Sequence, residues 1–124
     1  MQTQKSAKAD PSPVLTKAVL RAADIMGLNQ MTLAKVLGVS PASISRMRAG
    51  DYRLTPESKE WELATLLVRL FRGLDAIMAG DETALRSWLD SPNTALHDKP
   101  RALLIQVTGL TRTVDYVDGY RARV

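Results

Sequence analysis

The sequence predicts an all-α protein. Apolar residues recur at spacings of three and four along most of its 124 residues, which is the period of one helix face. Helix-start signals and glycines at helix ends divide this pattern into separate segments. No segment alternates apolar and polar residues with a period of two for long enough to predict a strand. The length allows one compact domain, but we favour two small modules joined by a long helix.

The N-terminal end is predicted to hold a tail followed by a first helix. Residues 1–11 are polar and lack apolar periodicity, so they predict a disordered tail. Ser12 and Pro13 then open a helix as its N-cap and first residue, and Gly27 suits its C-terminal cap. We expect this helix to pack behind the next two. Its apolar stripe is formed by Val14, Ala18, Ala22 and Ile25.

The next segment has the spacing of a helix-turn-helix, with predicted helices over residues 30–37 and 41–49. Ala34 leaves room for the second helix, and Gly38 supplies the positive φ that the tight turn needs. Ser40 is an N-cap, and proline follows it at the first helical position. The apolar residues of the motif are Leu33, Leu37, Val39, Ile44 and Met47.

The second helix of this motif is built to lie in the major groove of DNA. A plain αα-hairpin in a helical core is the alternative, but the predicted outward face of this helix is small or polar, which favours DNA. We expect Ser43 and Arg46 to read bases, with arginine able to bond guanine in a bidentate manner. Gln30 and the amides at the helix N-termini suit phosphate oxygens. The residues predicted to contact DNA are Gln30, Ser40, Ala42, Ser43, Ser45, Arg46, Arg48 and Arg53.

The net charge of +4 is unevenly distributed along the chain. Residues 1–60 carry nine Lys or Arg against five Asp or Glu, whereas residues 61–124 carry eight of each. The basic excess therefore accompanies the helix-turn-helix. Neutralisation of phosphates supplies most of the non-specific affinity for DNA, so this distribution fits a polyanionic partner for the N-terminal half.

A long amphipathic helix is predicted over residues 56–80. Thr55 serves as its N-cap, and Gly80 ends it. At 1.5 Å per residue this helix would be about 36 Å long. The apolar stripe is widened beyond one face by Leu63, Leu66 and Leu70. Part of the helix must therefore be covered from a second side, either by the C-terminal module or by a second subunit, and the pattern leaves both open.

Shorter helices are predicted after residue 80. Asp81 caps a helix that runs to Leu89, and residues 90–94 form a turn. The sequence Asp98-Lys99-Pro100 opens a further helix, which Gly109 is expected to break. A final helix spans residues 110–121.

Catalysis is not expected. The chain contains no cysteine and a single histidine, His97, so neither a metal site nor a cofactor is predicted. The pairs Asp81/Glu82 and Asp115/Asp118 fit a helix start and a helix face, and no glycine-rich phosphate loop occurs. The longest uncharged stretches are ten residues, too short for a membrane span, and no apolar signal core opens the chain. We expect a cytoplasmic protein that does not enter a membrane.

Several short motifs follow one another in the C-terminal half. They are Trp88-Leu89, Pro92-Asn93-Thr94-Ala95-Leu96, Lys99-Pro100 with Leu103-Leu104, Gly109 and Val114. This order resembles the toxin-binding domain of the Xre/MbcA/ParS antitoxin family. Together with the Xre/Cro-like helix-turn-helix before it, the resemblance covers nearly the whole chain. It departs from the family where residues 96–99 follow the Asn turn.

The resemblance implies a type II antitoxin with two partners. One is a cognate toxin of the RES type, which consumes NAD, and the other is operator DNA, through which the protein represses its own operon. The resemblance also implies that the C-terminal end approaches the toxin's active-site cleft. The residues placed there are Tyr120, Arg121, Arg123 and Val124.

These observations divide the chain into a tail (1–11), a DNA-binding domain (12–55), a connecting or dimerisation helix (56–80) and a toxin-binding domain (81–124). We expect a homodimer, and operators with two-fold symmetry, if the long helix pairs. The alternatives are a stand-alone dimeric helix-turn-helix repressor and a protein-interaction or partition module. A toxic neighbouring gene would distinguish an antitoxin from both.

Overall fold

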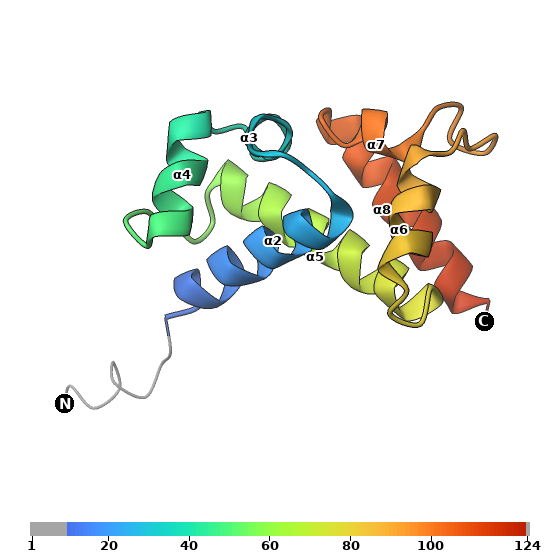
Figure 1. Cartoon of the computed structure of the whole chain (residues 1–124), viewed down its shortest axis with the longest axis horizontal. Helices are drawn as coiled ribbons and strands as arrows, with labels where there is room; N and C mark the ends of the chain where they lie inside the picture. Colours follow the sequence, from blue (N-terminus) through green and yellow to red (C-terminus); the bar gives the residue numbers. More distant parts are fainter. Residues whose placement is uncertain (1–9, 124) are drawn as a thin grey trace.

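The computed structural model describes residues 10–123, and within them it contains seven helices and no strand (Figure 1). The predicted all-α class is confirmed. Residues 1–9 of the predicted tail lie outside the described residues, and so does Val124. The helices are α2 (Ser12–Met26), α3 (Gln30–Leu37), α4 (Pro41–Ala49), α5 (Lys59–Ile77), α6 (Glu82–Asp90), α7 (Pro100–Leu103) and α8 (Val107–Ala122).

The start of α2 differs from the prediction. Ser12 is the first helical residue and is buried, whereas Pro11 occupies the N-cap position. The Ser12 N–H donates to Asp10 Oδ1 at 2.9 Å, and this hydrogen bond lowers the pKa of Asp10. Thr16 Oγ1 in turn accepts from the buried Leu54 N–H at 3.2 Å. The helix begins one residue earlier than expected, because the Asp10 carboxylate accepts from the N–H of the first turn in place of the Ser12 hydroxyl.

The helix-turn-helix has the predicted boundaries. The Asn29 side chain accepts from the Thr32 N–H at 2.8 Å and starts α3. The Ser40 hydroxyl accepts from the Ser43 N–H at 3.1 Å and starts α4. Between the two helices Gly38 has a φ of 72°, the left-handed conformation expected of this turn. The predicted turn chemistry is thus confirmed.

The long helix is shorter than predicted at both ends. α5 has 19 residues, about 28 Å at 1.5 Å per residue, and its N-cap is Ser58, not Thr55. Glu57 has a φ of 68°, so residues 55–58 form a turn before the helix. The Ser58 hydroxyl accepts from the Trp61 N–H at 3.2 Å and donates to the Thr55 carbonyl at 2.6 Å.

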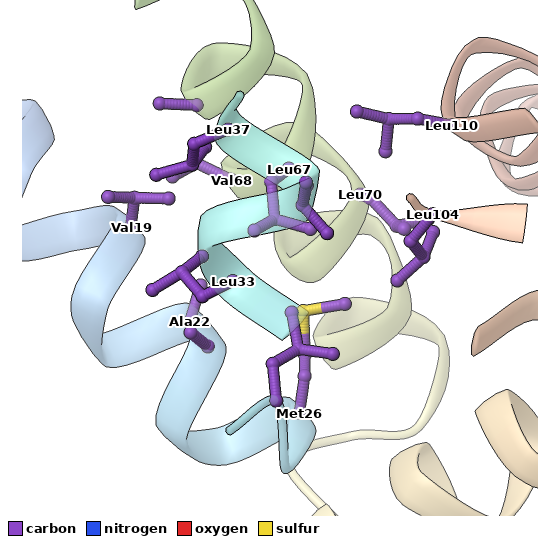
Figure 2. Packing of buried hydrophobic residues seen from close by; sticks show 14 of the residues in the cluster. Val19, Ala22, Met26, Leu33, Leu37, Leu67, Val68, Leu70, Leu104 and Leu110 are labelled. Atoms are coloured by element: carbon purple, nitrogen blue, oxygen red, sulfur yellow. The ribbon is translucent and has the colours of Figure 1, made fainter. Parts of the chain in front are cut away.

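A single hydrophobic core surrounds α5. Figure 2 shows side chains of α2 and α3, including Val19 and Leu33, packed against Leu67 and Val68 of α5, with Leu104 and Leu110 on the other side. Helix α8 lies along α5 opposite α2 (Figure 1). The second side of α5 is therefore covered by the C-terminal half of the same chain, which is one of the two arrangements that the sequence left open.

The close approach of α8 to α5 depends on a glycine that the sequence reasoning did not single out. Gly73 is buried in α5, and a Cβ at this position would lie 2.7 Å from Cγ1 of Val117. Only a residue without a side chain therefore lets the two helices pack at this distance. A glycine inside a long helix is the signal that could have indicated the contact.

The prediction that Gly109 breaks a helix is wrong. Helix α8 begins at Val107, two residues before Gly109, and α7 is only a four-residue turn of helix. Gly109 is buried, and a Cβ there would lie 2.2 Å from the carbonyl oxygen of Leu103. The glycine is required by the tight approach of α7 to the first turn of α8, and not by a change of backbone direction.

The loop between α6 and α7 is organised by Asn93, a residue of the Pro-Asn-x-Ala-Leu motif. Its side chain accepts from the Leu96 N–H at 3.0 Å, and its backbone pairs with Asp98 in an isolated bridge. Leu96 is buried, and its carbonyl oxygen accepts from Arg112 of α8 at 3.0 Å. Beyond the loop, Arg101 Nε donates to Asp90 Oδ1 at 2.6 Å, and this hydrogen bond lowers the pKa of the Asp90 carboxyl. The predicted turn is present and holds α6 against α7 and α8.

The C-terminal end of α2 is bound by an arginine from α6. Arg86 Nε donates to the Ile25 carbonyl at 2.7 Å, and its Nη2 donates to the Asp24 carbonyl at 2.9 Å. Cations are favoured at helix C-termini because the last carbonyl groups lack partners within the helix. Arg86 thus joins the two halves of the chain.

We expect Arg86→Ala to lower the free energy of unfolding by about 1 kcal/mol, because two charge-assisted hydrogen bonds are lost at an exposed site. Urea unfolding followed by circular dichroism measures the change. Lys17→Ala, an exposed cation on the same helix α2, is the matched control. Equal midpoints for the two variants would contradict a stabilising role for Arg86.

Candidate binding surfaces

Five of the residues predicted to contact DNA lie in α4, and four of these five are exposed. Ala42, Ser45 and Arg46 are exposed, while Ile44 and Met47 point into the core. Ser43 is buried with 9% of its surface exposed, so the prediction that it lies on the outward face is wrong. Its N–H donates to the Ser40 hydroxyl at 3.1 Å, and its own hydroxyl lies 3.0 Å from that of Ser40.

Gln30 joins the two helices of the motif. Its Nε2 donates to the Pro41 carbonyl at 2.9 Å and to the Ser45 hydroxyl at 2.7 Å. Both amide hydrogens therefore have partners within the protein. The arrangement fixes the position of the Ser45 hydroxyl on the exposed face of α4. Contact of Gln30 with phosphate remains a prediction.

Arg46 is held in place by two neighbours. Its Nη2 donates to the Ser43 hydroxyl at 3.1 Å, and its guanidinium carbon lies 5.8 Å from the centre of the Tyr52 ring. The Tyr52 hydroxyl donates to Glu60 Oε2 at 2.5 Å, and this bond, together with burial, raises the pKa of Tyr52. The arginine is thus oriented before any ligand binds. Sequence reasoning missed Tyr52 and Glu60 because no spacing rule connects α4 to the loop and helix that follow it.

The other two predicted DNA-contacting arginines form ion pairs. Arg48 bonds Asp24 of α2 at 2.8 Å, and Arg53 lies 3.5 Å from Asp10. All four side chains are at least one third exposed. Exposed ion pairs contribute little to stability, so these arginines can exchange a carboxylate for a phosphate at small cost.

The predicted toxin-binding residues lie at the end of α8. Tyr120 has 49% of its surface exposed, and Arg121 is also exposed. Arg123 directly follows the helix as its C-cap, and Val124 lies outside the described residues. Trp88 of α6 is partly buried and stacks on Tyr116 with ring centres 6.4 Å apart.

Across residues 10–123 no group of three or more His, Asp or Glu is placed to hold a metal ion. His97 is exposed in the loop before α7, Asp81 caps α6, and Asp118 pairs with Arg69 at 2.5 Å. Within the same part of the chain, no helix is long and apolar enough to cross a membrane.

The fold and the exposed face of α4 define a helix-turn-helix protein with a helical C-terminal module. The chain belongs to the Xre-like antitoxin family. Residues 6–69 match the antitoxin Xre-like helix-turn-helix domain, and residues 70–123 match the antitoxin Xre/MbcA/ParS C-terminal toxin-binding domain. The two matches meet inside α5, and neither describes an enzyme. A comparison with curated proteins found no match to this sequence.

Proposed function

We propose that this protein is the antitoxin of a type II system that blocks a RES-type, NAD-consuming toxin and represses its own operon. The observation that carries the proposal is that one helix, α5, contributes to both matched domains and to one core. A DNA-binding surface and a toxin-binding surface are therefore parts of a single folded unit. Toxin bound to the C-terminal module would be brought to the operator with the antitoxin.

On the DNA side, α4 enters the major groove and Arg46 contacts a guanine. Ala42 allows close approach, and Ser45 lies nearer to phosphate. The backbone amides at the N-termini of α3 and α4, at Gln30 and after Ser40, bind phosphates together with Arg48 and Arg53 and set the register. A homodimer whose interface lies away from the faces of α5 that α2 and α8 cover would bind an operator with two half-sites about one helical turn apart.

On the toxin side, the end of α8 enters the active-site cleft of the toxin. Tyr120 supplies an exposed aromatic ring, and Arg121 and Arg123 pair with acidic groups. Val124 is proposed as a further contact. In this proposal residues 12–55 are the DNA-binding domain, residues 56–80 connect it, and residues 81–124 form the toxin-binding domain.

We expect Arg121→Ala with Arg123→Ala to weaken neutralisation of the toxin, with a loss of about tenfold in affinity, because two charge-assisted contacts are removed. Growth of cells that express the toxin, together with binding of the purified proteins, measures the effect. Arg21→Ala, on α2, is the control for the loss of positive charge. Unchanged rescue by the double variant would exclude these arginines from the interface.

Co-expression with the product of the adjacent gene tests the proposed function. A stable complex that relieves growth arrest, with an active toxin that depletes NAD in the absence of the antitoxin, is the expected result. A harmless neighbour that does not bind would instead favour a stand-alone dimeric repressor. Binding of the purified protein to DNA from immediately upstream of its gene then tests the repressor function by itself.

A further inference from the structure

An apolar groove lies between the C-terminal half of α5, α6 and α8. Its volume is about 320 Å³. Two aliphatic side chains of α5, the methionine that follows this helix, and aromatic rings of α6 and α8 line the groove. The principal lining residues are Leu74, Ile77, Met78, Trp88, Tyr116 and Tyr120.

The aromatic walls of the groove remain in contact with solvent. Tyr116 and Tyr120 have 37% and 49% of their surfaces exposed, and Trp88 is only partly buried despite its stacking on Tyr116. Tryptophan and tyrosine dominate the energetics of protein interfaces because each buries a large surface with few rotatable bonds. A stacked pair that is already ordered loses little entropy when a partner covers it.

The groove continues to a positive charge. A second hollow of about 250 Å³ shares Ile77 and Tyr120 with the first and ends at Arg121. The nearby Arg69 is paired with Asp118, whereas the structure records no ion pair for Arg121 among residues 10–123. A partner that fills both hollows would place an apolar side chain beside Trp88 and an acidic group beside Arg121.

We propose that this groove is the anchor site for the toxin, and that it takes an aromatic or large aliphatic side chain followed by an acidic residue. The inference rests on the proposed function, because it assumes that the C-terminal module binds a toxin. Every residue that lines the groove lies within the part matched to the toxin-binding domain, which favours the toxin over DNA or a second copy as the occupant. The interface therefore extends from the end of α8 back to Trp88 of α6.

Substitution of the two exposed tyrosines tests the site in the full-length protein. Tyr116→Ala and Tyr120→Ala should each weaken binding of the toxin encoded beside this gene by about tenfold or more. Val14→Ala is the matched control, because Val14 is an apolar residue of α2 with 69% of its surface exposed. All three variants should bind the upstream DNA fragment as the unsubstituted protein does, which shows that the fold is retained.

The two tryptophans provide an independent measurement that needs no substitution in the groove. In protein labelled with 5-fluorotryptophan, the fluorine signal of Trp88 should shift when toxin binds, while that of Trp61, in α5 beside α2, should not. A Trp61→Phe variant assigns the two signals. The comparison separates a local contact from a general change of the protein.

Three results would overturn the inference. In the first, both tyrosine variants bind toxin with unchanged affinity and the Trp88 fluorine signal does not shift. This result leaves the proposed function intact but places the toxin elsewhere. The second is a dimer that becomes a monomer on Tyr116→Ala, which assigns the groove to a second copy. The third is absence of any complex with the unsubstituted chain, which rejects the proposed function as well.

Discussion

Gly109→Ala is expected to lower the free energy of unfolding by about 3 kcal/mol or more and to abolish binding of the toxin. The added Cβ would lie 2.2 Å from the carbonyl oxygen of Leu103 and 3.0 Å from its carbonyl carbon. A backbone carbonyl cannot rotate away as the end of a side chain can. The α7 turn must therefore move away from α8, and buried Leu104 would lose its packing.

Gly119→Ala is the matched control because Gly119 lies in the same helix and its Cβ would meet nothing within 4 Å. Here the substitution should raise the free energy of unfolding by about 0.5–1 kcal/mol, since alanine restricts the unfolded chain and favours the helix. Urea unfolding of both variants gives the comparison. The free energy of unfolding should fall in Gly109→Ala and rise in Gly119→Ala. A similar small change in both variants would show that α7 and α8 are not in this close contact.

Arg46→Ala is expected to reduce affinity for the upstream DNA fragment by about 10- to 100-fold, the value of one good bidentate contact to a base. Affinity for an unrelated fragment of equal length should fall much less, because that binding depends on phosphate contacts from many residues. Arg21→Ala removes the same charge from α2 and serves as the control. Equal losses on both fragments would assign Arg46 to phosphate instead of a base.

Tyr52 and Glu60 provide a sharper test of how Arg46 is positioned. Tyr52→Leu removes the ring beneath the guanidinium, and we expect a loss of about two- to fivefold in affinity for the upstream fragment. Tyr52→Phe keeps the ring but removes the 2.5 Å bond to Glu60. Neither substitution should change DNA affinity further when Arg46 is already alanine, because a positioning residue acts only through the group that it positions.

The two candidate surfaces lie on different helices. The helix-turn-helix lies at one end of the molecule and the end of α8 at the other, with α5 between them (Figure 1). Toxin in the groove would leave the exposed face of α4 free. The proposed toxin-binding and DNA-binding residues therefore do not overlap on the chain.

Local sequence signals predicted the helix-turn-helix well. The ends of α3 and α4 are set by Asn29, Gly38 and Ser40, each of which acts on backbone groups one to three residues away. The same kind of signal failed at α5, where Thr55 and Ser58 both resemble N-caps. The positive φ of Glu57 separates them, and propensity alone does not favour that conformation for glutamate.

The sequence by itself determined the all-α class, the caps of the helix-turn-helix, and the order of motifs that leads to the antitoxin family, because these depend on short spacings. The tertiary structure decided which residues meet across longer separations. It buried Ser43 against the cap of α4, placed Gly109 against Leu103, covered α5 with α8, and set Tyr52 beneath Arg46. Close packing between distant segments fixes these contacts, and no periodic pattern along one segment contains that information.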